Sequence, residues 1–243
     1  MGLNACYRRG WGFILWRVGL ILLALCLLPG QDAAAADLWP GSKKIFNTMD
    51  FKSKLQGVPQ WMRVMQSGEK EIAVLSTCQP GNAGCPKAAG AWQKLSNELQ
   101  GKPALEQLRA VTKFFNTWPY RLDKDNYGVD DYWAAPLEFV KNSGDCEDYS
   151  IIKYYALKRL GYDPNNMRIV AVQDTILKLG HAILAVYVDG KVYILDNQTS
   201  GVFEDSRYPQ YVPQYSVNEF FKWAHMPQSQ NRGGGRGAGG GGR

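Results

Sequence analysis

The stretch "SGDCEDYSIIKYYALKRLG", residues 143–161, predicts a buried helix with a cysteine in its first turn. The unpaired N–H groups at the start of a helix favour a thiolate at Cys146. Two neighbouring carboxylates, Asp145 and Glu147, disfavour that thiolate because like charges repel. Either the cysteine is inert, or the chain supplies a positive charge beside it. The helix is indicated by a glycine stop and by apolar positions at the helical period: Ile151, Ile152, Tyr155, Leu160 and Gly161.

A hairpin predicted over residues 181–195 supplies the positive group. "HAILAVYV" and "KVYIL" are typical of strands, and the "DG" between them favours a two-residue turn. Such a turn places Asp196 opposite Ile183, so that Asp196 and His181 are diagonal neighbours on one face. Diagonal neighbours lie roughly 7–8 Å apart at Cα, a gap that an imidazole and a carboxylate can bridge. The register holds unless a bulge interrupts the hairpin.

Cys146, His181 and Asp196 are therefore the candidate catalytic residues of a thiol enzyme. In such a set the thiolate is the nucleophile, the imidazole moves the proton and the aspartate fixes the tautomer of the imidazole. The alternative is structural, because a free cysteine is commonly a small buried apolar residue. A histidine at the start of a strand also commonly serves only the fold. The three residue types in these positions together favour catalysis.

A second pattern upstream of the cysteine predicts a calcium site. In "DKDNYGVDD", residues 123–131, three possible ligands hold alternate positions: Asp123, Asp125 and Tyr127. This spacing is similar to the first half of a calcium-binding loop, although the distal bidentate glutamate is absent. Asp145 and Glu147 could supply the remaining oxygens, and a cation there would neutralise the acids around the cysteine. The alternative is an ordinary surface turn.

The remaining patterns predict an α+β fold, with helices mainly in the first half of the chain and strands in the second. Trp61, Val64 and Met65 have helical spacing. His225, the other histidine downstream, is assigned to a structural role. The further predicted elements are helices at 88–100, 103–116 and 217–224 ("VNEFFKWA") and a strand at 167–172 ("MRIVAV").

Residues 1–36 are typical of an export signal. Basic residues precede the eleven-residue apolar run "VGLILLALCLL" (18–28), and four alanines at 33–36 provide a cleavage site after Ala36. An uncleaved membrane anchor is the first alternative, although the apolar run is short for a membrane span. A lipoprotein site at Cys26 is the second. Export predicts an oxidising compartment, in which Cys78 and Cys85 are expected to pair across a turn-rich loop while Cys146 stays unpaired.

Composition favours a folded protein and gives no sign of nucleic-acid binding. Hydrophobic residues make up 45% of the 243 residues, which is enough to bury a core. The formal net charge is +6, and this value includes three arginines in the predicted signal and three in the C-terminal tail. The part between them is close to neutral, so the basic balance does not indicate a polyanionic partner.

Two blocks of the sequence resemble one known family. "DYWAAPLEFVKNSGDCEDYSIIKYYALKRLG" (131–161) and "GHAILAVYVDGKVYILDNQT" (180–199) are similar to the bacterial transglutaminase-like cysteine proteinases. The resemblance extends from about Lys44 to Trp223, and "GDCEDY" is its most specific motif. It implies a papain-like core with an N-terminal helical lobe and a C-terminal antiparallel sheet. It also implies the triad Cys146, His181 and Asp196.

The resemblance carries further expectations about cofactor, substrate and partner. It implies activity that depends on calcium, with Asp145 and Glu147 at the metal and Asp123, Asp125 and the Tyr127 backbone as additional ligands. The implied substrate is the N-terminal region of a large surface adhesin, cut at paired alanines in a segment of small residues. The implied partner is the periplasmic domain of an inner-membrane receptor for cyclic di-GMP. The expected location is the periplasm, with a role in biofilm dispersal.

These expectations divide the chain into three parts. A signal peptide covers 1–36, a protease domain covers 37–229, and a disordered glycine–arginine tail covers 230–243. Within the protease domain, 37–116 is expected to be mainly helical and 117–229 to form the catalytic α/β part. Three alternatives remain open at this stage: a transglutaminase-like acyltransferase, a calcium-binding module without catalysis, and a cell-wall amidase.

Overall fold

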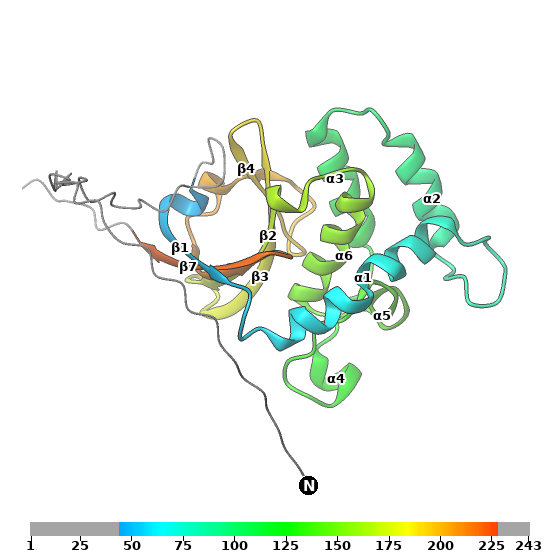
Figure 1. The fold of residues 1–243 in the computed structure, drawn as a ribbon, viewed down its shortest axis with the longest axis horizontal. Helices are drawn as coiled ribbons and strands as arrows, with labels where there is room; N and C mark the ends of the chain where they lie inside the picture. Colours follow the sequence, from blue (N-terminus) through cyan, green and yellow to red (C-terminus); the bar gives the residue numbers. More distant parts are fainter. Residues whose placement is uncertain (1–43, 228–243) are drawn as a thin grey trace, which may run out of the picture. The chain divides into compact units, whose positions relative to one another are not determined.

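The computed structural model describes residues 44–227. The predicted signal peptide (1–36) and the glycine–arginine tail (230–243) therefore lie outside the described residues. Within 44–227, helices gather on one side of an antiparallel sheet (Figure 1). No helix in this range combines the length and the apolar character that crossing a bilayer requires. The fold class is α+β, as predicted.

Helices dominate the first two thirds of the described chain. Apolar side chains at helical spacing form the buried face of each long helix, as Trp61 and Val64 do in the first of them. The helices are α1 (Pro59–Thr77), α2 (Ala89–Glu98), α3 (Ala104–Phe115), α4 (Asp123–Tyr127), α5 (Pro136–Asn142) and α6 (Cys146–Arg159). Short 3-10 turns are η1 (Ile45–Asn47), η2 (Pro164–Asn166) and η3 (Asp205–Arg207).

Seven strands form one sheet in the order β1-β7-β6-β2-β3-β4-β5. Every strand pair is antiparallel. The strands are β1 (Thr48–Lys54), β2 (Met167–Asp174), β3 (Leu179–Val188), β4 (Lys191–Leu195), β5 (Phe203–Glu204), β6 (Tyr211–Val217) and β7 (Phe221–Pro227). The predicted strand at 167–172 corresponds to β2.

The β3–β4 hairpin confirms the predicted register. Val188 pairs with Lys191 and Leu184 pairs with Leu195, as a two-residue turn requires. Asp189 and Gly190 have φ of 48° and 74°. Positive φ at both central residues is the geometry that favours the Asp-Gly dipeptide. This turn carries Asp196 back to the end of β3 where His181 lies.

Strands occur in two places where the sequence predicted helical structure. The helix predicted at 217–224 is wrong: β6 ends at Val217 and β7 begins at Phe221. The burial of Trp223 and His225 between exposed neighbours follows the period of two that a strand requires. The Asn218 side chain closes the turn by accepting the Phe220 and Phe221 N–H groups at 2.8 and 2.9 Å. In the N-terminal part expected to be mainly helical, 48–54 is strand β1, which pairs with β7.

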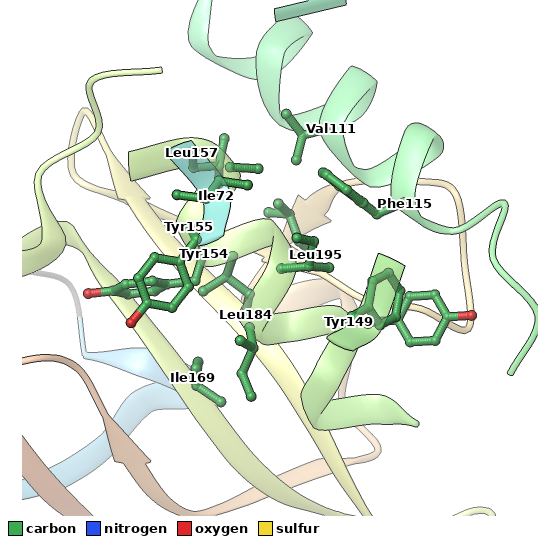
Figure 2. Packing of buried hydrophobic residues seen from close by; sticks show 14 of the residues in the cluster. Ile72, Val111, Phe115, Tyr149, Tyr154, Tyr155, Leu157, Ile169, Leu184 and Leu195 are labelled. Carbon is green, nitrogen blue, oxygen red and sulfur yellow. The ribbon is translucent and has the colours of Figure 1, made fainter. Parts of the chain in front are cut away.

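The α6 helix is the central element of the core. It packs against α1, α3 and α5 and against strands β2 and β3. Figure 2 shows side chains of α6, including Tyr154 and Leu157, in one cluster with Phe115 of α3 and with sheet residues such as Leu184. Ten consecutive residues of α6, from 148 to 157, are buried. A buried helix of this kind fixes the position of its first residue, Cys146, relative to the sheet.

Two features outside the core agree with the sequence. The predicted disulfide joins Cys78 and Cys85, and Cys146 is free. His225 is buried between β1 and β6, with Nδ1 at 2.9 Å from Asp50 and Nε2 at 2.8 Å from the Ser216 hydroxyl. Ser216 has no exposed surface. His225 therefore has the structural role assigned to it.

Candidate active site

The start of α6 is fixed by the Asp148 carboxylate. Its Oδ1 accepts the Ala134 N–H at 2.5 Å, and its Oδ2 accepts the Asp145 N–H at 3.2 Å. A Cβ at Gly144 would overlap the same carboxylate. The "GDCED" sequence thus has a local reason: glycine leaves room for the aspartate that holds the first turn of the helix. Cys146 follows directly as the first residue of α6.

The Cys146 sulfur lies next to β3. The backbone N–H of Ala182, the residue after His181, hydrogen-bonds the sulfur and lowers its pKa. Three other influences raise the pKa of the Cys146 thiol well above its ordinary value: burial first, then the negative charges of Glu147 and Asp145. The thiol also donates to Glu147 Oε2 at 3.2 Å. Without a cation, this environment favours the neutral thiol.

His181 and Asp196 form the pair that the hairpin register predicted. His181 Nε2 lies 2.9 Å from Asp196 Oδ1, and both side chains are buried. Asp196 Oδ1 also accepts the Gln198 N–H at 2.9 Å, and Oδ2 accepts the Tyr211 hydroxyl at 2.7 Å. Burial alone would raise the pKa of Asp196, but the hydrogen bond and positive charge of His181 bring it below its usual value.

This geometry decides which nitrogen of His181 is free. An ionised carboxylate can only accept hydrogen bonds, so the proton of a neutral imidazole lies on Nε2. Nδ1 then carries the lone pair that can take a proton from a thiol. Since the Ala182 N–H contacts the sulfur, the structure brings Cys146, His181 and Asp196 to one place, on α6, β3 and the residue after β4.

A cluster of carboxylates surrounds the start of α6. Its oxygens converge in overlapping groups, each within 4.8 Å: Asp123, Asp131 and Glu147 in one, Asp123, Asp145 and Asp148 in another. Asp123 Oδ1 and Asp145 Oδ1 are buried and have no hydrogen-bond partner among residues 44–227. Burial raises the pKa of Asp123 to about 6, although the Tyr132 N–H opposes the shift. Burial and the charge of Glu147 raise the pKa of Asp145 to about 8.

The structure brings only some of the predicted metal ligands together. Asp123, Asp145 and Glu147 belong to the cluster. The Asp125 carboxylate does not, because 123–127 forms helix α4 rather than an open loop. Residues two apart on a helix point to opposite sides, so Asp123 is buried while Asp125 is exposed. The Tyr127 ring stacks on Tyr132 with centroids 4.0 Å apart.

The prediction missed two members of the cluster. Asp131 ends the "DKDNYGVDD" segment, and Asp148 stands in the "GDCEDY" motif. Their positions depend on how the loop before α5 folds back over α6, which no local spacing reveals. The indole N–H of Trp133 donates to Asp131 Oδ1 at 3.0 Å. Tyr120 was also missed: burial raises its pKa above the ordinary value, and the negative charge of the nearby Cys146 adds to that shift.

Comparison with protein-family models identifies the class. Residues 65–231 match the model of the bacterial transglutaminase-like cysteine proteinases. The chain belongs to this family, and the class that fold and site define is therefore a cysteine protease. No curated protein sequence matches the chain.

Among solved structures, the chain is similar to LapG of Legionella pneumophila. The identity is 33% with a TM-score of 0.55, over 68% of this chain and 91% of that one. A calcium-bound structure of the same protein matches at 32% identity, over 68% of this chain and 93% of that one, with a TM-score of 0.55. An EGTA-treated structure matches at 33% identity, over 66% and 87%, with the same TM-score.

Proposed function

We propose that this chain is a calcium-dependent endopeptidase in which Cys146, His181 and Asp196 form the catalytic triad. The carrying observation is the contact between the Cys146 sulfur and the residue after His181, together with the 2.9 Å bond from His181 to Asp196. The order nucleophile, imidazole, carboxylate is what peptide-bond cleavage through a thioester requires.

The reaction follows from the position of each group. His181 Nδ1 takes the thiol proton, and the Cys146 sulfur attacks the scissile carbonyl. The imidazolium, stabilised by the buried Asp196 carboxylate, then protonates the leaving amine and a thioester remains. A water deprotonated by His181 hydrolyses the thioester and regenerates the thiol. The Cys146 backbone N–H, at the start of α6, is placed to donate to the oxyanion because first-turn N–H groups have no acceptor within the helix.

The acidic cluster fits a calcium ion. Its donors are carboxylate oxygens, the type that calcium prefers, and two of them are buried without a partner among the described residues. Asp123, Asp131, Asp145 and Glu147 would hold the ion, while Asp148 is already occupied by two backbone N–H groups. Bound calcium would neutralise the charges that now disfavour the Cys146 thiolate and would tie α4 to the start of α6.

The substrate, partner and location are proposed from the resemblance. We place the enzyme in the periplasm after removal of residues 1–36. Its substrate is the N-terminal region of a large LapA-like surface adhesin, cut at paired alanines, and its action promotes biofilm dispersal. Its partner is the periplasmic domain of a LapD-like receptor for cyclic di-GMP, which would sequester the protease. Calcium-bound LapG supports the metal part of this proposal.

The test is digestion of a purified N-terminal adhesin fragment that contains a pair of alanines. Wild type with calcium is expected to give two new peptide termini at that pair, and EGTA is expected to stop cleavage. Cys146→Ala and His181→Gln should be inactive. His225→Gln is the matched control, because His225 is equally buried but bonds only to strand residues.

Other results would overturn the proposal in identifiable ways. A mass gain in the presence of a primary amine, without new termini, would indicate an acyltransferase. Release of peptides from purified peptidoglycan, with the adhesin fragment intact, would indicate an amidase. If Cys146→Ala cleaves as fast as wild type, Cys146 is not the nucleophile. If wild type cleaves neither the fragment nor peptidoglycan and transfers no amine, a calcium-binding role without catalysis is the better account.

A further inference from the structure

Lys153 is a fully buried lysine on the helix that carries the nucleophile. It lies two turns after Cys146 on α6, and no part of it reaches solvent. Within residues 44–227 no carboxylate forms an ion pair with its amine. Burial lowers the pKa of Lys153 to about 7, and the negative charge of Asp196 opposes that shift. An apolar side chain of the same length would fill this space without the cost of burying an amine.

Among residues 44–227 the amine has one hydrogen-bond acceptor, and this acceptor belongs to Asp196 of the proposed triad. Lys153 Nζ donates to the backbone carbonyl of Asp196 at 3.2 Å. The same carbonyl accepts from Asn116 Nδ2 at 2.9 Å, and this amide also donates to the Thr199 carbonyl at 2.9 Å. Asn116 is the C-terminal cap of α3. A side chain of α6 and the C-cap side chain of α3 therefore both bond the backbone of Asp196, while its carboxylate bonds His181.

Asp196 needs this support because it stands just outside regular structure. β4 ends at Leu195, so Asp196 lacks the ladder hydrogen bonds that fix the preceding residues. Its carboxylate orients His181 only if its backbone stays in place. A displacement of about 1 Å at a catalytic group is enough to cost a large factor in rate.

We propose that Lys153 is a positioning residue: by bonding the Asp196 carbonyl from α6, it sets the place of the acid relative to the nucleophile. This inference rests on the proposed triad. Through Asp196, Lys153 holds His181 in the tautomer that leaves Nδ1 free for the thiol. Both the ammonium and the neutral amine carry N–H donors, so the bond to the carbonyl persists in either form.

The test compares Lys153→Met with Lys158→Met, a control on the same helix whose amine bonds to Glu69 and Glu219 at the surface. The chain has only two histidines, so imidazole 1H–15N spectra report on His181 and His225 separately. In wild type we expect His181 as the Nε2–H tautomer. In Lys153→Met its nitrogen shifts should move toward a mixture of tautomers, while those of His225 stay unchanged. Lys158→Met should match wild type at both histidines.

Kinetics on the adhesin fragment supply a second readout. Lys153→Met should lower kcat by about tenfold or more with KM within about twofold, because the residue does not touch substrate. If Lys153→Met does not fold, Asn116→Ala removes the other donor to the same carbonyl and should shift His181 in the same direction. An unchanged His181 spectrum in the folded variant overturns the inference. A wild type that cuts no adhesin fragment overturns the proposed function instead, and the spectra still decide the role of Lys153.

Discussion

The buried amine of Lys153 makes a contribution to the pH dependence of stability that the variant Lys153→Met removes. Its pKa is about 7 in the folded protein, against an ordinary value of 10.5. Between these two pH values the unfolded chain binds more protons than the folded one. The free energy of unfolding must therefore rise with pH in this window, through the contribution of Lys153. Below pH 7 the folded protein bears the full cost of protonating the buried amine, and above pH 10.5 this cost is absent because the amine is neutral in both states.

The magnitude follows from the two pKa values. Each pH unit well inside the window contributes about 1.4 kcal/mol, and the slope is smaller near pH 7 where the folded amine is half protonated. Between pH 7 and pH 9 the stability of wild type should rise by about 2 kcal/mol relative to Lys153→Met. Other titrating groups are shared by the two proteins and cancel in the difference.

Urea denaturation at pH 7, 8 and 9, followed by tryptophan fluorescence, measures this difference. Lys158→Met is the control, because the hydrogen bonds and charges of Glu219 and Glu69 raise the pKa of Lys158 despite its partial burial. Lys158 stays protonated in both states up to pH 9, so its variant should keep a constant offset from wild type. A constant offset for Lys153→Met as well would refute the reasoning, since the amine would then titrate as it does in water.

Three further predictions concern other parts of the molecule. Replacing Cys78 and Cys85 by serine should lower the free energy of unfolding by about 2 kcal/mol with kcat unchanged, because the bridge closes a short loop between α1 and α2, neither of which carries a triad residue. A loss of kcat in the folded variant would contradict this. Calcium should raise Tm in wild type and in Asp125→Asn but little in Asp123→Asn, by differential scanning fluorimetry, since only Asp123 belongs to the cluster. Equal shifts in all three would exclude Asp123 as a ligand. His225→Gln should destabilise the protein by about 1–3 kcal/mol, because Asp50 and Ser216 lose a buried partner; an unchanged urea midpoint would contradict this role.

The catalytic pair could be predicted because its cause is local. An Asp-Gly turn fixes the register of a short hairpin, and register alone places Asp196 beside His181. The helix that begins at Cys146 could also be predicted from the sequence, because its apolar period and the glycine that ends it lie within one stretch. The contact between the Cys146 thiol and Ala182 of β3 could not be predicted from the sequence, because it joins residues 36 positions apart through the packing of α6.

The errors have a common origin in contacts distant along the chain. "VNEFFKWA" has an apolar pattern compatible with a helix, but pairing with β1 and β6 selects a strand. Asp125 was expected at the metal because an open loop was assumed where α4 forms. Lys153 resembled any lysine of an amphipathic helix, and only the packing of α3 and the hairpin against α6 shows it to be buried.

The pairing of β1 with β7 bears on when the chain can fold. β1 lies at one edge of the sheet, and β7 is its sole neighbour within the ladder of residues 44–227. Because β7 comes last, the first strand cannot dock until synthesis has nearly finished. The sheet is therefore complete only when both ends of the described range, 48–54 and 221–227, are present. A chain shortened before β7 would leave β1 without a ladder and would turn β6 into an edge strand.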